Sequence, residues 1–206
     1  MAVPGAAIHD FEIQKGFAIN ALAIQYPVRV LTDYCSPATA SLVATTEMEI
    51  RRARIEDAPA ACDVLRRSIT ELCVADHHDD PAILQRWLAN KTPQIVASWI
   101  ARPGNTMLVA TEDDTILGVG SVTDTGEITV NYVSPDARFR GVSRALISAL
   151  ENRAVQCGNT RCYLTSTETA RGFYHRAGYS EDGPPAGKFG TSGSYPMSKA
   201  LAPLRL

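Results

Sequence analysis

The stretch that decides the fold reads Tyr132-Val133-Ser134-Pro135-Asp136-Ala137-Arg138-Phe139-Arg140-Gly141-Val142-Ser143-Arg144-Ala145-Leu146. Its first residues end an alternating, strand-like segment, and its last residues begin a segment with apolar positions at helical spacing. A loop between a strand and a helix leaves the first backbone N–H groups of the helix without an intrahelical partner and adds the positive end of the helix dipole. The stretch therefore predicts a phosphate-binding turn between a strand and a helix.

The loop also has the side chains that an anion site needs. Gly141 and the small Ser143 allow a ligand to approach the backbone closely. Three arginines, Arg138, Arg140 and Arg144, concentrate positive charge in a protein whose formal net charge is −2. The residues alone leave a second interpretation open, in which the loop is a solvated basic cap on a core helix.

Outward from this stretch, strand and helix patterns alternate from Met48 to the C-terminus, which predicts an α/β layered domain. The expected elements are a strand starting at Met48, a helix capped by Asp57, short helices at 81–90 and from 93, strands at 106–111 and 116–123 joined by a turn at Asp113-Asp114, a strand at 127–133, a helix at 141–155, a strand at 162–165, a helix at 167–177 ended by Gly178, a loop at 183–193 and a strand at 196–201.

Residues 1–47 differ from the rest of the chain. They contain three prolines and little helical periodicity, and their few basic residues are accompanied by acidic ones, so a signal or transit peptide is the weaker interpretation. The character of the sequence changes at Met48. We expect residues 1–47 to be an extension that is loosely ordered or not native, and residues 48–206 to form the functional domain.

Composition narrows the function classes. With 45% hydrophobic and 20% charged residues among 206, the chain has enough apolar matter for a core, and its charge balance gives no general basic field for nucleic acid. Neither G-x-x-x-x-G-K-S/T nor a strand-to-helix G-x-G-x-x-G occurs, which argues against P-loop and Rossmann sites. No apolar run reaches the ~18 residues of a membrane span. Five cysteines without a C-x-x-C pair favour a reducing, cytoplasmic location.

Two motifs in this order resemble those of the GNAT-type N-acetyltransferases. The loop is similar to the family's acetyl-coenzyme A motif Q/R-x-x-G-x-G/A, with Arg138, Gly141 and Ser143 at the fixed places and the serine as a departure. Residues 167–179 are similar to the family's ending N-x-x-A-x-x-x-Y-x-x-x-G-F/Y, with Thr167 in place of the asparagine. The order of strands and helices fits the family from Met48 to the C-terminus.

The resemblance implies a GNAT-like α/β fold with a mixed, mostly antiparallel central sheet and helices on both faces. It implies direct transfer of the acetyl group of acetyl-coenzyme A, a co-substrate, to an amine of an unidentified acceptor, without a metal. The pantetheine arm would hydrogen-bond to the main chain of a splayed strand, like an added strand. The implied cofactor-binding residues are Tyr132, Val133, Arg138, Phe139, Arg140, Gly141, Val142, Ser143, Arg144 and Thr167.

Acetyl transfer also needs groups that move protons. A free alkylammonium has a pKa near ~10.4, so a base or a water relay must take its proton. Glu127 stands 138 − 127 = 11 positions before Arg138, as the glutamate base does in family members that use one, and strand alternation places it on the same face as Asn131. The resemblance assigns protonation of the departing thiolate to Tyr174. The alternatives are a solvated carboxylate at a strand start and an aromatic ring that only packs the helix against the sheet.

The segment Asp76-His77-His78-Asp79-Asp80 could suggest a metal site. Adjacent residues in a flexible loop cannot all aim at one ion, so we interpret the segment as a solvated helix cap. In the resembling family this region lines the acceptor pocket, where the acids could attract a cationic amine.

Two other functions stay open at this point. One is a catalytically weak or inactive domain that binds or senses acyl-coenzyme A, and the other is a structural or interaction domain. For the leading function we expect a small-molecule or peptide amine as acceptor, with no nucleic acid or membrane partner. A homodimer is compatible with the sequence.

Overall fold

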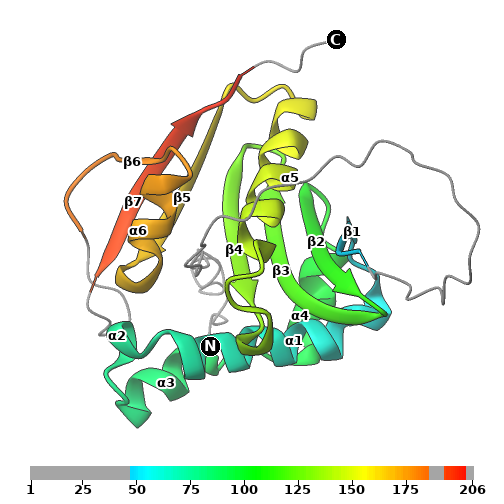
Figure 1. Cartoon of the computed structure of the whole chain (residues 1–206), viewed down its shortest axis with the longest axis vertical. Coiled ribbons are helices and arrows are strands. Elements are labelled where there is room, and N and C mark those ends of the chain that lie inside the picture. The colour runs from blue at the N-terminus through cyan, green and yellow to red at the C-terminus, as the bar shows by residue number, and fades with distance from the viewer. Residues whose placement is uncertain (1–46, 186–192, 203–206) are drawn as a thin grey trace, which may run out of the picture.

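The computed structural model describes residues 47–185 and 193–202 (Figure 1). Its first part contains strand β1 (Glu49–Arg52) and the helices α1 (Ala58–Arg67), α2 (Val74–His77), α3 (Pro81–Leu88) and α4 (Pro93–Ile100). Then follow β2 (Asn105–Glu112), β3 (Thr115–Thr123), β4 (Glu127–Val133), α5 (Val142–Gln156), β5 (Arg161–Thr167), α6 (Glu168–Arg176), β6 (Ser180–Glu181) and β7 (Ser194–Ala200). The order confirms the alternation that the sequence predicts.

The strands form one seven-stranded sheet in the order β1-β2-β3-β4-β5-β7-β6. All neighbouring strands pair antiparallel except β4 and β5, which are parallel. Figure 1 shows α5 and α6 in front of the sheet, while α1 and α4 pack against the other face of β3 and β2. The predicted fold class, a mixed and mostly antiparallel sheet with helices on both faces, is confirmed.

Two glycines in β3 let α5 lie close to the sheet. A Cβ atom at Gly118 would stand 2.7 Å from Val142 Cγ1 and 2.9 Å from Leu146 Cδ1, and one at Gly120 would stand 2.9 Å from Leu150 Cδ1. The buried stripe of α5 therefore fills the space that side chains would otherwise take. This contact fixes the helix whose N-terminus follows the arginine-rich loop.

Local signals of the sequence explain several element ends. The turn between β2 and β3 has positive φ at Asp113 (45°) and Asp114 (62°), as the tightest hairpin turns require. Asp80 accepts hydrogen bonds from the backbone N–H groups of Ala82 at 2.7 Å and Ile83 at 3.3 Å, and so caps α3. The predicted hairpin and the predicted start of the helix at residue 81 are confirmed.

The structure corrects the expected first helix. α1 ends at Arg67, and a π-helical turn at Ser68–Leu72 leads into α2, which the sequence analysis did not separate. The Asp57 side chain does not cap α1; its carboxylate accepts two hydrogen bonds from the Arg51 guanidinium, at 2.7 and 2.9 Å, and one from the Arg54 backbone N–H. The Arg51 guanidinium lowers the pKa of Asp57. The acid thus links β1 to the turn before α1.

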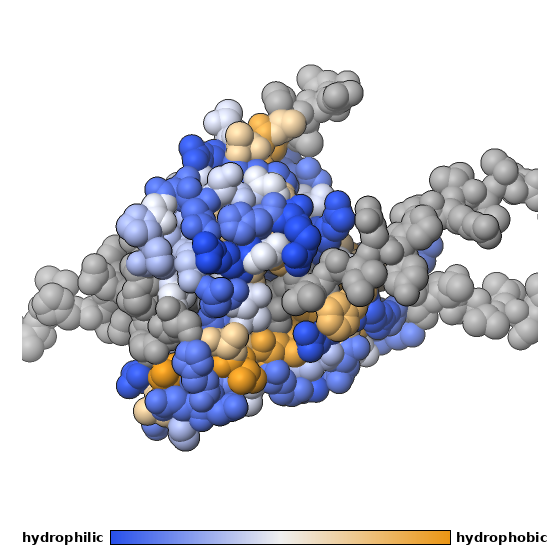
Figure 2. Space-filling view, turned by 60° about the vertical axis from the view of Figure 1, so that its left-hand side comes forward, coloured by the Kyte–Doolittle hydropathy of each residue, from blue (hydrophilic) through white to orange (hydrophobic). Residues whose placement is uncertain are grey.

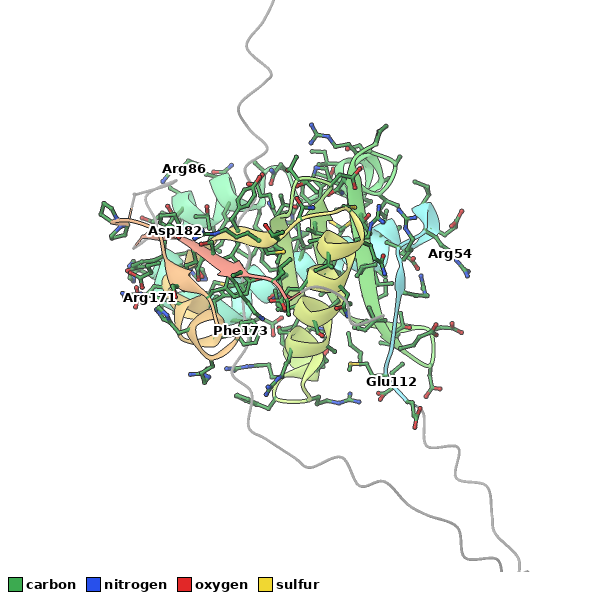
Figure 3. All side chains as sticks on the ribbon, turned by 90° about the horizontal axis from the view of Figure 1, so that it is seen from above. Arg54, Arg86, Glu112, Arg171, Phe173 and Asp182 are labelled. Atoms are coloured by element: carbon green, nitrogen blue, oxygen red, sulfur yellow. The ribbon has the colours of Figure 1, made fainter. Side chains whose placement is uncertain are left out.

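The surface over α6 is mostly hydrophilic, and apolar residues gather below it, at the height of α2 and α3 (Figure 2). Glu181 pairs there with Arg171 at 2.7 Å and lies 3.0 Å from His175. Figure 3 shows Arg171 pointing outward from α6, whereas Phe173 points toward the sheet. α6 is therefore amphipathic, with a solvated outer face and an aromatic inner face.

Among the described residues, none of the helices is both long and apolar enough to cross a bilayer.

Candidate active site

A gap opens where β4 and β5 diverge. The two strands pair only through Glu127 with Tyr163 and Ile128 with Leu164. Beyond these pairs β5 continues alongside β7 as far as Thr167, and Figure 1 shows β4 and β5 spreading apart toward α2. Among the described strands, none pairs with this edge of β4 after Ile128, so its backbone groups face the gap. Such an edge can hydrogen-bond an extended ligand as it would another strand.

The loop between β4 and α5 has two left-handed residues. Phe139 has a φ of 62° and Gly141 a φ of 81°, and α5 begins directly after them at Val142. Left-handed residues between right-handed or extended ones turn successive N–H groups inward and form a concave anion-binding nest. A left-handed non-glycine residue costs about 1 kcal/mol or more and is typical of functional sites. The backbone of the loop is concave, and phosphate binding by this turn stays a prediction.

The three arginines of the loop do not all behave as the sequence suggests. Arg140 pairs with Glu112 at 2.5 Å and lowers the pKa of that carboxyl, so its charge is partly compensated. Arg138 stacks over the ring of Phe139, with 4.8 Å between the guanidinium carbon and the ring centroid. Arg144 is exposed on the first turn of α5. Of the three, only Arg140 is paired with an acid in the described part of the chain.

Tyr174 lies on the inner face of α6 and is fully buried. Its hydroxyl oxygen accepts a hydrogen bond of 3.3 Å from Asn131 Nδ2, and its ring packs edge-on against Phe173 and Tyr179 with centroid distances of 5.1 and 5.5 Å. Burial raises the pKa of Tyr174, so the phenol keeps its proton at neutral pH. Thr167 caps the helix by accepting from the Ala170 N–H at 3.4 Å, as expected.

Asn131 is the residue that the sequence analysis named only by its strand face. It is fully buried in β4 and joins the strand to Tyr174 across the gap. A signal was available, because an asparagine between Val130, Tyr132 and Val133 is a polar residue where a buried strand normally has apolar ones. Buried amides need hydrogen-bond partners, and that requirement points to a polar neighbour across the gap.

A bulge in β4 changes the predicted position of Glu127. Ser121 pairs with Val130 but Val122 pairs with Ile128, so Thr129 is an extra residue in β4. The alternation therefore shifts at Thr129, and Glu127 shares a face with Val130 rather than with Asn131. The expectation that Glu127 and Asn131 lie on one face was wrong, because strand alternation assumes a regular strand.

This shift places the two catalytic candidates on opposite faces of the sheet. Asn131 pairs with Gly120, which faces α5, so Asn131 and Tyr174 lie on the α5 and α6 side. Glu127 is half-buried on the α1 side, four residues or roughly 13 Å along the strand from Asn131 at ~3.3 Å per residue. A proton could pass between Glu127 and a reacting group at the gap only through water.

The segment 76–80 is not a solvated cap throughout. Asp76 and His77 are fully buried, which contradicts the expected exposure, whereas Asp80 is the exposed cap of α3. The Asp76 carboxylate accepts the backbone N–H groups of Glu168 at 2.9 Å and Thr169 at 3.2 Å, and burial raises its pKa. Asp76 therefore ties α2 to the N-terminus of α6, the helix that holds Tyr174.

Comparisons with known proteins agree with this geometry. A family model for the acetyltransferase (GNAT) domain matches residues 73–201. A structure described as "GCN5-Related N-acetyltransferase: Aminotransferase, Class-II" from Rhodopseudomonas palustris is 25% identical, covers 79% of this chain and 100% of its own, and has a TM-score of 0.67. The paia N-acetyltransferase of Thermoplasma acidophilum in complex with coenzyme A is 18% identical, with coverages of 75% and 99% and a TM-score of 0.65. A GCN5-related N-acetyltransferase from Kribbella flavida is 23% identical, with coverages of 75% and 98% and a TM-score of 0.58.

A search of curated proteins finds no match. The family model spans the chain from the turn before α2 to the end of β7, and it includes both the loop before α5 and the helix of Tyr174. The solved structures share the fold of this chain over 75–79% of its length. The chain therefore belongs to the GNAT acetyltransferase family, whose members transfer an acyl group from acyl-coenzyme A to an amine.

Proposed function

We propose that the protein transfers the acetyl group of acetyl-coenzyme A directly to a primary amine of a small molecule or a peptide. The observation that carries this proposal is the buried Tyr174 hydroxyl, held by Asn131 at the gap where β4 loses its strand partner. A protonated phenol at this place can serve a departing thiolate, which a domain that only binds coenzyme A would not need.

The donor would bind from the side of α5 and α6. The pyrophosphate fits the concave loop at Phe139 and Gly141, where a Cβ atom at the glycine would meet nothing within 4 Å. The pantetheine arm would follow the free edge of β4 and bond to the main chain near Tyr132 and Val133. The side chain of Tyr132 is buried on the α1 side, which leaves the backbone as the contact surface.

In the proposed reaction, Glu127 and Tyr174 would act from opposite faces of the sheet. The amine enters from the face of Glu127, loses a proton to that carboxylate through water, and attacks the thioester carbonyl to form the new C–N bond. The C–S bond then breaks, and the thiolate leaves toward the face of Tyr174 and receives the phenol proton. The nitrogen of the new amide releases its second proton to solvent, and a proton from solvent converts the phenolate back to the phenol, because a buried tyrosinate is strongly disfavoured.

A screen of amines and peptides with acetyl-coenzyme A, monitored by thiol release and by mass of the product, tests this function. We expect acetylation of at least one class of primary amine at a rate well above that without enzyme. Tight binding of coenzyme A without transfer to any acceptor would instead identify a sensing domain.

We propose that residues 48–206 form the catalytic domain, and that the protein works in the reducing cytoplasm. The second point is supported by the four cysteines of the described ranges, which are all free thiols. A fragment of residues 48–206 should bind coenzyme A as tightly as the full chain in a calorimetric titration. A weaker affinity in a folded fragment would assign residues 1–47 a part in binding.

A further inference from the structure

The amide of Asn131 faces the proposed proton donor and little else. Its Nδ2 donates to the Tyr174 hydroxyl at 3.3 Å, and its Oδ1 is buried without a hydrogen-bond partner in the described structure. The opposite residue on β3 is Gly120, so no side chain from that strand competes for the amide. Tyr174 is therefore the group that holds the amide, although buried amides normally have all of their polar atoms paired.

We infer that Asn131 is a positioning residue that directs the proton of Tyr174 into the gap between β4 and β5. The inference rests on the proposed acid role of Tyr174. A hydroxyl oxygen that accepts a hydrogen bond from Nδ2 must point its own O–H away from that nitrogen. The ring is held by Phe173 and Tyr179, so rotation of the hydroxyl is the remaining freedom, and the Asn131 donor removes part of it.

The bulge at Thr129 is part of this arrangement. Because Thr129 is the extra residue, Asn131 lies on the α6 side, while Glu127 lies on the α1 side. Strand β4 thus presents the amide to the acid on one face and the candidate base on the other. A regular strand with the same residues would place both groups on the same side of the sheet.

The opposite orientation of the amide makes a contrary prediction. If Oδ1 faced Tyr174, the phenol O–H would donate a hydrogen bond to Asn131 and would point away from the departing thiolate. Asn131→Asp distinguishes the two arrangements, because a carboxylate has nearly the same shape and can only accept. A donor at this position helps the reaction under our inference, so the aspartate should be as harmful as a residue without any polar group.

The experiment compares Asn131→Leu, Asn131→Asp, Tyr174→Phe and the double variant Asn131→Leu/Tyr174→Phe, with Tyr179→Phe as the control. Tyr179→Phe keeps the buried ring that packs against Tyr174 and removes only a hydroxyl group that the proposed mechanism does not use. Hydroxylamine replaces the unidentified acceptor, because it is neutral at neutral pH and needs no base. Single-turnover thiol release from bound acetyl-coenzyme A is measured, with the enzyme-free rate subtracted.

We expect Asn131→Leu and Asn131→Asp each to lower the single-turnover rate by about 10- to 100-fold, part of the ~100-fold or larger effect of general acid catalysis. The affinity for acetyl-coenzyme A should stay unchanged. In the Tyr174→Phe background, Asn131→Leu should have no further effect, because the proton that it directs is gone. Tyr179→Phe should react like the parent protein.

Multiplicative losses in the double variant would overturn the inference, since Asn131 would then act independently of Tyr174. A parental rate in Asn131→Asp would overturn it as well. If Tyr174→Phe itself keeps the parental rate, the proposed acid role fails, whatever Asn131 does. Should Asn131→Leu not fold, Asn131→Asp in both backgrounds gives the same comparison.

Discussion

At the scale of single residues, Glu127 decides how the rate depends on pH if it takes the amine's proton through water. Glu127→Gln keeps the size of the side chain but removes the base. We expect the rate to fall by about 100-fold or more at the lower end of the pH range, where most of the acceptor is protonated, and less at higher pH. A pH–rate profile with a reactive primary amine measures this.

Glu49→Gln is the matched control, because Glu49 is an exposed carboxylate at the start of another strand, β1. Its profile should coincide with that of the parent protein. With hydroxylamine, Glu127→Gln should also react at the parental rate, since no proton has to leave before attack. A Glu127→Gln profile that matches the parent with the primary amine would remove this residue from the mechanism.

The sequence predicted the candidate residues better than their orientation. Tyr174 and Gly141 follow from motif spacing. The structure places Tyr174 beside the gap and Gly141 in the loop before α5. Asn131 carries no motif, and its role depends on a hydrogen bond to a residue 43 positions later in the chain. The face of Glu127 depends on an extra residue in β4, which only the pairing with β3 reveals.

At the scale of elements, Gly141 tests the loop before α5. Gly141→Glu adds bulk and negative charge where the pyrophosphate is proposed to bind, so calorimetric titration should show loss of coenzyme A binding. Gly158→Glu is the matched control, because Gly158 has a similar φ of 86°, has open space around its Cβ position and follows the C-terminal end of α5. It should strain the backbone equally and leave the affinity unchanged. Equal affinities in both folded variants would disprove the assignment of the loop.

The link between β1 and the turn before α1 should make stability depend on pH. Arg51 lowers the pKa of Asp57 from 3.8, so this pair stabilises the fold above that value and the contribution is lost as the pH falls through the folded-state pKa. Arg51→Met should reduce the free energy of unfolding by about 1 kcal/mol at neutral pH and by less in acid. Denaturant titrations at several pH values measure this. Arg52→Met, which changes an exposed neighbour, should not produce a loss of stability that is larger at neutral pH than in acid.

The longer elements could be predicted because their signals are local. Strand β4 has the predicted bounds 127–133, and α5 begins one residue after the expected Gly141. The helix α2 and the strand β6 could not be predicted. They have four and two residues respectively, and segments this short show no periodic pattern. α2 also depends on tertiary contacts, since Asp76 binds the N-terminus of α6.

At the scale of the whole molecule, stability depends on how closely α5 approaches the sheet. Gly118→Ala would bring a Cβ atom to 2.7 Å from Val142 and 3.1 Å from the Tyr132 carbonyl oxygen, so it should destabilise the fold by about 1–3 kcal/mol. Gly172→Ala is the matched control, because Gly172 is exposed on α6. It should stabilise the fold by roughly 0.5–1 kcal/mol through helix propensity. Thermal unfolding of both variants tests the contrast, and equal shifts would contradict it.

The overall architecture was predictable from the alternation of strands and helices and from the two motifs. The place where the sheet opens was not, because pairing between β4 and β5 involves residues about 36 positions apart and stops after two pairs. Periodicity reports how a strand is buried, but it does not report where its neighbour leaves it.

The divergence of β4 and β5 also has a mechanical consequence. The sheet consists of a four-stranded half and a three-stranded half, and two residue pairs form the backbone seam between them. Bound acetyl-coenzyme A would form hydrogen bonds to the free edge of β4, where no strand of the described structure pairs. It would thereby couple the two halves of the sheet. Saturation at 100 times the dissociation constant adds about 2.7 kcal/mol to the folded state. Loading with the donor should therefore slow amide hydrogen exchange on both sides of the seam, including strands that the donor never touches.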